Sequence, residues 1–315
     1  MCEGGGEWAV GVCLTALNWA LDFLGQRMKR YRVMNMEFDT RAAVLSTEIE
    51  PSWKPNVREQ WEANRESLRE SLRAEYGAWA FEQKEKNFIE LGAAPFSLVA
   101  FHNEFFWQAR RAFVIGAYYP SLTALCALGE RVLNHLVLTF RGEFDSTSEY
   151  RKVYRKNSFD DWTLAIDALE AWRVLLPRAA ERFRELKSLR NRSLHFNPET
   201  ETNVREKALE ASKLFCDIIQ TQFAAFGPNP WFIPNRQGVS LVRKASENDP
   251  FVKKIVLPNC VYVGPSHSVL PSASGAAVIS DADDYEEREI SDEEYLELLA
   301  SGPRAPATTM ARSSE

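Results

Sequence analysis

The 315-residue sequence lacks the signatures of several classes of protein. Its five cysteines are scattered, with no CxxC pair and no histidine close to a pair, so neither a disulfide framework nor a metal site is expected. No ligand cluster and no glycine-rich phosphate loop supports a metalloenzyme or a nucleotidyl transferase. We therefore predict that no metal and no cofactor is needed, and isolated cysteines suit a reducing cytoplasm.

A membrane span is also missing. The best candidate, Ala9–Leu24, contains Asn18 and Asp22 and follows acidic rather than basic residues. It is too short and too polar to span a bilayer, and its charge does not suit a signal peptide. We predict an amphipathic helix there and no membrane partner.

Charge is distributed unevenly along the chain. The segment from Asp281 to Glu315 has eleven acidic and three basic residues, a net charge of −8 against −6 for the whole chain, so residues 1–280 carry +2. A nearly neutral body neither demands nor excludes a nucleic-acid partner. The hydrophobic content of 45% is ample for a folded core.

Apolar residues at helical spacing predict a mainly α fold. The arginines of Val57–Gly92 alternate with acids, which favours a solvated helix face over a nucleic-acid-binding face. A break at Gly92 to Pro95 should separate this segment from the helices that follow. We expect these helices at 96–117, 121–140, 160–176, 177–195 and 203–226.

Two segments of this region carry polar residues of interest. The helix at 121–140 is so apolar that it should be buried on most sides, and Glu130 within it needs a partner. That partner is either an arginine from the end of the 177–195 helix or, locally, Arg131 or solvent. Arg141–Lys156 is expected to be a loop, and its basic residues and tyrosines, Lys152 and Arg155 among them, either bind RNA or form an exposed connection.

The end of the 177–195 helix gathers Arg190, Asn191, Arg192 and His195. Pro198 disfavours helical geometry just beyond the histidine. Five residues along a straight helix rotate the side chain by about 140°, so Arg190 and His195 can converge only where the helix loosens. Together they suit phosphate chemistry, because arginine presents a fixed fork of donors and histidine carries a proton near neutral pH.

The sequence LRNRSLHF, Leu189–Phe196, resembles the Arg-polar-x-x-x-His motif of the HEPN superfamily (higher eukaryotes and prokaryotes nucleotide-binding). The apolar, acid-bearing helix Tyr118–Leu136 resembles that family more loosely. The resemblance implies a HEPN-like antiparallel helical bundle at residues 95–227. Around it we predict an N-terminal helical extension at 1–94, a small β hairpin at 228–265, and a flexible linker with an acidic helix at 266–315.

Many members of that superfamily are metal-independent endoribonucleases whose motifs line a cleft between two subunits. The resemblance thus implies RNA as substrate, a homodimer, and Arg190, Asn191 and His195 as catalytic residues. Arg192, Lys152 and Arg155 are expected to bind the substrate, with Glu130 in support. Roles as a toxin, in phage defence or in RNA processing stay open.

The alternative is a non-catalytic HEPN-like module that dimerises or binds RNA or protein. In that case His195 caps its helix and Arg190 pairs with Glu130.

The C-terminal region has two further signals. The runs Val239–Val242 and Lys254–Val263 are prone to form strands and predict the hairpin. Ser291 to Glu294 has a capping-box pattern, which predicts a short acidic helix that docks on a protein partner or on the body of the chain.

Overall fold

The computed structural model describes residues 27–194, 202–234, 238–271, 277–282 and 284–301. His195 and the helix expected at 9–24 lie outside these residues. Within them the fold is mainly helical, as the sequence predicted, and it also contains small two-stranded sheets. The chain divides into two compact units, one of residues 31–261 and one whose described residues are 27–30 and 262–301.

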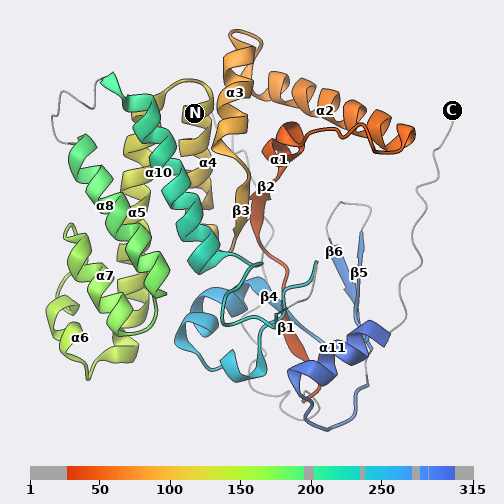
Figure 1. The fold of residues 1–315 in the computed structure, drawn as a ribbon. Coiled ribbons are helices and arrows are strands. Elements are labelled where there is room, and N and C mark those ends of the chain that lie inside the picture. The colour runs from red at the N-terminus through yellow and green to blue at the C-terminus, as the bar shows by residue number, and fades with distance from the viewer. Residues whose placement is uncertain (1–26, 195–201, 235–237, 272–276, 283, 302–315) are drawn as a thin grey trace, which may run out of the picture. The chain divides into compact units, whose positions relative to one another are not determined.

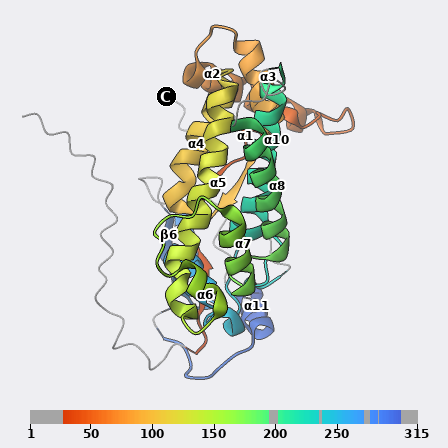
Figure 2. The ribbon, with the colours of Figure 1, turned by 90° about the vertical axis from the view of Figure 1, so that its left-hand side faces the viewer.

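The larger unit is built on helices that run side by side (Figure 1 and Figure 2). The longest of them, the strongly apolar α5, contacts each of the others and has eleven buried residues. Burial on several sides is what its nearly continuous apolar sequence predicted. The helices are α4 (Ala100–Val114), α5 (Tyr118–Phe140), α7 (Trp162–Ala171), α8 (Pro177–Leu194) and α10 (Val204–Ile218).

The expected helix at 203–226 ends early because its last residues join a β-structure. α10 continues as a π-helical turn over Ile219–Phe223. The Phe223 carbonyl then accepts the Leu98 N–H at 2.9 Å, beside strand β3 (Ala94–Ser97). β3 also pairs antiparallel with β2 (Glu37–Asp39).

The long helix expected from Val57 to Gly92 is broken into α2 (Pro55–Tyr76) and α3 (Phe81–Leu91). Gly77 and Ala80 both have positive φ, 79° and 52°, which no helix interior accommodates. The preceding region also contains a short helix, α1 (Arg41–Ser46).

Residues 141–156 are more ordered than the predicted loop. They contain a 3₁₀ turn, Arg141–Phe144, and a short helix, α6 (Ser148–Val153). The Thr147 hydroxyl caps α6 by accepting the Tyr150 N–H. The Arg141 guanidinium donates to three carbonyls at the other end of α6, those of Val153, Tyr154 and Lys156.

The two β-prone runs do not pair with each other as a hairpin. Leu241 and Val242 instead bridge to Arg32 and Phe232 respectively. The second run begins as a π-helical turn, Val252–Val256, and becomes strand β4 only at Cys260–Val263. β1 (Arg30–Val33) and β4 each contain a boundary between the two units.

The smaller unit contains an antiparallel pair, β5 (Ser268–Pro271) and β6 (Ala277–Ser280), where composition predicted a linker. It also contains the predicted acidic helix, α11 (Asp292–Ser301). The Ser291 hydroxyl accepts the Glu294 N–H at 3.1 Å, which confirms the capping interaction. No described helix is both long and apolar enough to cross a membrane.

Candidate functional site

Arg190 lies in the last turns of α8 and reaches across to α5. Its Nη2 atom is 3.2 Å from Oε2 of Glu130. The two side chains are 27% and 30% exposed, so the pair sits at the edge of the bundle, in contact with solvent. Of the partners that the sequence left open for Glu130, the structure selects the arginine from the end of α8.

Trp162, at the start of α7, completes this contact. Its indole N–H donates to the same Glu130 oxygen at 3.2 Å. The Arg190 guanidinium carbon lies 5.8 Å from the indole ring centroid, within the range of a cation–π interaction. The carboxylate and the ring together restrict where the guanidinium can lie.

Gly129 of α5 allows α7 and α8 to pack close to α5. A Cβ atom at this position would lie 2.6 Å from the Trp162 ring and 2.9 Å from the Leu186 side chain of α8. Both distances are shorter than van der Waals contact, so a larger residue would force the helices apart. Sequence reasoning missed Gly129 and Trp162, although a glycine inside a strongly apolar helix is a signal of close packing.

Asn134 fixes the chain that leads into α7. Its side-chain oxygen accepts the Phe159 N–H at 2.6 Å, and its amide donates to the Phe159 carbonyl at 3.0 Å. This pair of bonds anchors the residue three positions before Trp162. Asn134 therefore positions the aromatic ring rather than contacting Arg190 directly.

The neighbouring motif residues are at the surface. Asn191 is exposed, and its side-chain oxygen accepts from Arg190 Nη1 at 3.4 Å. Arg192 is also exposed. His195, with which Arg190 was predicted to converge, lies outside the described part of the chain.

Lys152 and Arg155 are exposed at and just after the end of α6. Arg155 lies over the Tyr154 ring, 5.0 Å from its centroid. Arg141, which holds this end of α6, follows the last residue of α5 and lies eleven residues beyond Glu130. That is about 16 Å along the helix axis, so the two cations do not contact the Arg190 site.

Cys126 lies one turn before Glu130 and is fully buried. Burial raises the pKa of its thiol to about 12, with Arg190 opposing the shift. It therefore stays protonated at neutral pH and packs as a small apolar residue, as its place in the sequence predicted.

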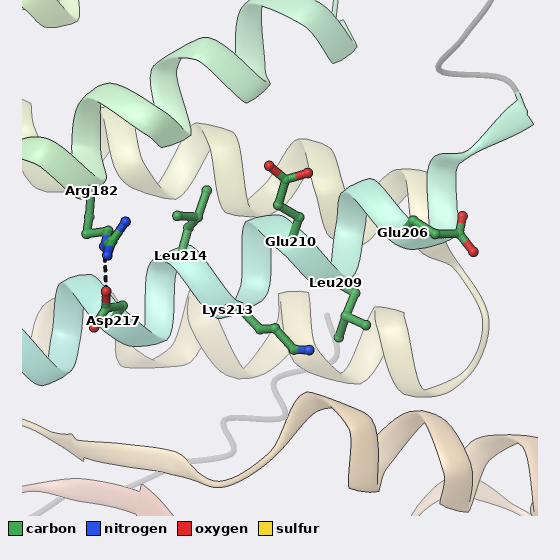
Figure 3. Close-up of a pocket in the computed structure, with 7 residues that line it drawn as sticks. All are labelled: Arg182, Glu206, Leu209, Glu210, Lys213, Leu214 and Asp217. Atoms are coloured by element: carbon green, nitrogen blue, oxygen red, sulfur yellow. Dashed lines mark hydrogen bonds and ion pairs between the residues drawn. The ribbon is translucent and has the colours of Figure 1, made fainter.

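A surface groove of about 540 Å³ runs along α10 and does not include Arg190 (Figure 3). Arg182 of α8 points toward α10 there and pairs with Asp217 at 2.6 Å. Carboxylates outnumber cations in the lining, which disfavours an RNA phosphate. The lining residues are Arg182, Glu206, Leu209, Glu210, Lys213, Leu214 and Asp217.

Chemically, the Arg190 site presents a partly exposed guanidinium whose position is restricted and whose remaining N–H donors are available to an anion. Among the described residues, no three His, Cys, Asp or Glu side chains are grouped as metal ligands. Comparison of the chain with protein-family models, with curated proteins and with solved structures finds no match.

Proposed function

We propose that the protein is a metal-independent endoribonuclease whose active site forms at a homodimer cleft. The observation that supports this is the Arg190 guanidinium, held at the end of α8 by Glu130 and Trp162 and partly exposed. An arginine fork of this kind binds phosphate oxygens and stabilises charge that builds on them.

In the proposed reaction, the 2′-oxygen of one nucleotide attacks the adjacent phosphorus and the bond to the 5′-oxygen breaks. The 2′-hydroxyl loses a proton and the 5′-oxygen gains one, which leaves a 2′,3′-cyclic phosphate and a 5′-hydroxyl. His195 is assigned the proton transfer, since imidazole titrates near neutral pH. Arg190 stabilises the non-bridging oxygens, and Asn191 orients the phosphate.

Other residues have supporting roles in this proposal. Glu130 is a positioning residue, because it acts through Arg190. Arg192 contacts the substrate backbone close to the motif. Lys152 and Arg155 lie in and just after α6, near Arg141, which is about 16 Å from Glu130 along the helix axis. They contact the RNA strand beyond the cleavage point.

The alternative is a non-catalytic HEPN-like module for dimerisation or for binding RNA or protein. The ion pair of Arg190 with Glu130 favours it specifically, because a purely structural arginine would make this contact. An experiment therefore has to distinguish a catalytic role of Arg190 from a structural one.

The decisive experiment compares RNA cleavage by the wild type, Arg190→Ala and His195→Ala in the presence of EDTA. We expect cleavage by the wild type and a loss of at least about a hundredfold in each variant. The matched control is Arg178→Ala, an arginine on the same helix whose side chain is 65% exposed. Equal cleavage by all four proteins would end the catalytic assignment.

A further inference from the structure

The turn between α2 and α3 presents an exposed tryptophan. Gly77 and Ala80 take positive φ, and the Lys84 ammonium holds the turn by donating to the Tyr76 carbonyl at 2.6 Å. Trp79 consequently projects outward and is 82% exposed, more than any other large apolar side chain that the structure describes. Tryptophan is usually well buried, so an ordered turn that exposes one calls for a reason.

A basic concavity adjoins this tryptophan. It has a volume of about 790 Å³, and the residues on either side of Trp79, Ala78 and Ala80, both line it. The other lining residues are Arg69, Arg73, Phe81, Glu82, Gln83 and Lys86. Three cations against one carboxylate make the concavity attractive to an anion.

Two of these cations have no carboxylate partner among the described residues. Arg69 is bound by Glu85 at 2.8 Å and is therefore already compensated. The Arg73 guanidinium instead stacks on the Phe81 ring, 4.7 Å from its centroid, and Lys86 is exposed. Arg73 and Lys86 can thus receive an anionic group without first breaking an ion pair.

The ring itself suits a stacked partner. The Lys84 ammonium lies 5.8 Å from the Trp79 ring centroid, while most of the ring surface remains in solvent. Aromatic rings beside cationic grooves bind nucleic-acid strands, because bases stack on the ring and phosphates pair with the cations.

We propose that this corner binds a nucleotide unit, with its base stacked on Trp79 and its phosphate on Arg73 and Lys86. The site is separate from Arg190, and the proposal does not depend on ribonuclease activity. The nucleotide is either part of a single strand or a free mononucleotide, since both offer a base and a phosphate.

The test uses the full-length chain and fluorescently labelled single-stranded DNA, which lacks the 2′-hydroxyl and so cannot undergo the proposed cleavage. Fluorescence anisotropy should show that Trp79→Ala and the double variant Arg73→Ala, Lys86→Ala each weaken binding by about tenfold. Trp79→Phe should retain part of the affinity. The control is Tyr119→Ala, which removes an exposed aromatic side chain elsewhere.

Competition by adenosine monophosphate and by an unlabelled oligonucleotide then distinguishes the two sources. Displacement by the mononucleotide supports a free ligand, and displacement only by the oligonucleotide supports a strand. The proposal is overturned if both Trp79→Ala and the double variant bind like the wild type. An acidic peptide provides a second test. If it displaces the DNA equally well from the wild type and from Trp79→Ala, the site recognises charge alone and the proposal is also overturned.

Discussion

At the scale of single residues, the most consequential position in the bundle is one without a side chain. Gly129 brings α5 close to Trp162 and Leu186, and the next residue, Glu130, thereby reaches both Trp162 and Arg190. The Arg190 site thus depends on close packing beneath it as much as on its own charges.

We expect Gly129→Ala to destabilise the larger unit. A methyl group here overpacks the contact at a cost of about 1–3 kcal/mol, against a helix-propensity gain of about 1 kcal/mol. Urea denaturation should show a net loss of about 1 kcal/mol in the free energy of unfolding. The control is Gly142→Ala, where an added Cβ meets nothing within 4 Å; equal stability of both variants would contradict the packing argument.

His102 makes stability depend on pH. Burial, with further repulsion from His135 and Arg131, lowers its pKa to about 4 from an ordinary value of 6.5. Between these pH values the unfolded chain binds a proton that the folded chain does not, so the free energy of unfolding falls as the pH drops from 6.5 toward 4. The full effect is about 3 kcal/mol.

Urea denaturation at pH 7 and at pH 5 measures this contribution. The wild type should lose more stability on acidification than His102→Gln, because the variant lacks the imidazole that gains a proton on unfolding. An identical loss in the two proteins would show that His102 is not the responsible group.

At the scale of elements, the Arg190–Glu130 pair joins α8 to α5 at a partly exposed edge. A double-mutant cycle with Arg190→Met and Glu130→Gln should give a coupling energy of about 0.5–1 kcal/mol, since solvent screens such pairs. This is too little to hold the helices together. A coupling above about 3 kcal/mol would instead assign the pair to the stability of the fold.

The helices were the most predictable part of the structure. Apolar spacing located α5 and α8 closely, and the pattern at Ser291 located the start of α11. Elements that depend on partners distant in sequence were not predictable. The π-helical end of α10 depends on the hydrogen bond of Phe223 with Leu98, beside β3. The turn before α3 places Ala80, a non-glycine residue, at positive φ.

The site was predictable to a similar degree. Glu130 stood out because a carboxylate in so apolar a helix needs a partner, and Arg190 stood out because of its place in the Arg-polar-x-x-x-His motif. Trp162 and Gly129 did not, because their roles depend on how three helices pack together. No pattern within a single segment of the sequence predicts how the three helices pack.

At the scale of the whole molecule, the smaller unit is held by a buried cation. Arg30 is fully buried, and its Nε atom is 2.8 Å from Oδ1 of Asp292. Its Nη2 atom donates to the Ile290 carbonyl at 2.6 Å, and its guanidinium lies 5.5 Å from the buried Tyr295 ring. A buried guanidinium deprived of its carboxylate is strongly unfavourable.

We therefore expect Asp292→Asn to lower the free energy of unfolding of the smaller unit by about 2–4 kcal/mol. Hydrogen–deuterium exchange on the full chain should show faster exchange in α11, with little change in α5. The control is Glu297→Gln, which removes an exposed carboxylate from the same helix. Unchanged exchange in Asp292→Asn would mean that the ion pair contributes little.

The contact between Arg30 and Asp292 joins positions 262 residues apart, and it also orders events in time. During translation, Arg30 leaves the ribosome long before its carboxylate partner has been synthesised. Residues 31–261 can fold in that interval, whereas the smaller unit can close only after α11 has emerged. A chain that ends at Val261 and has been released from the ribosome should therefore resist protease around α5 and remain cleavable near Arg30.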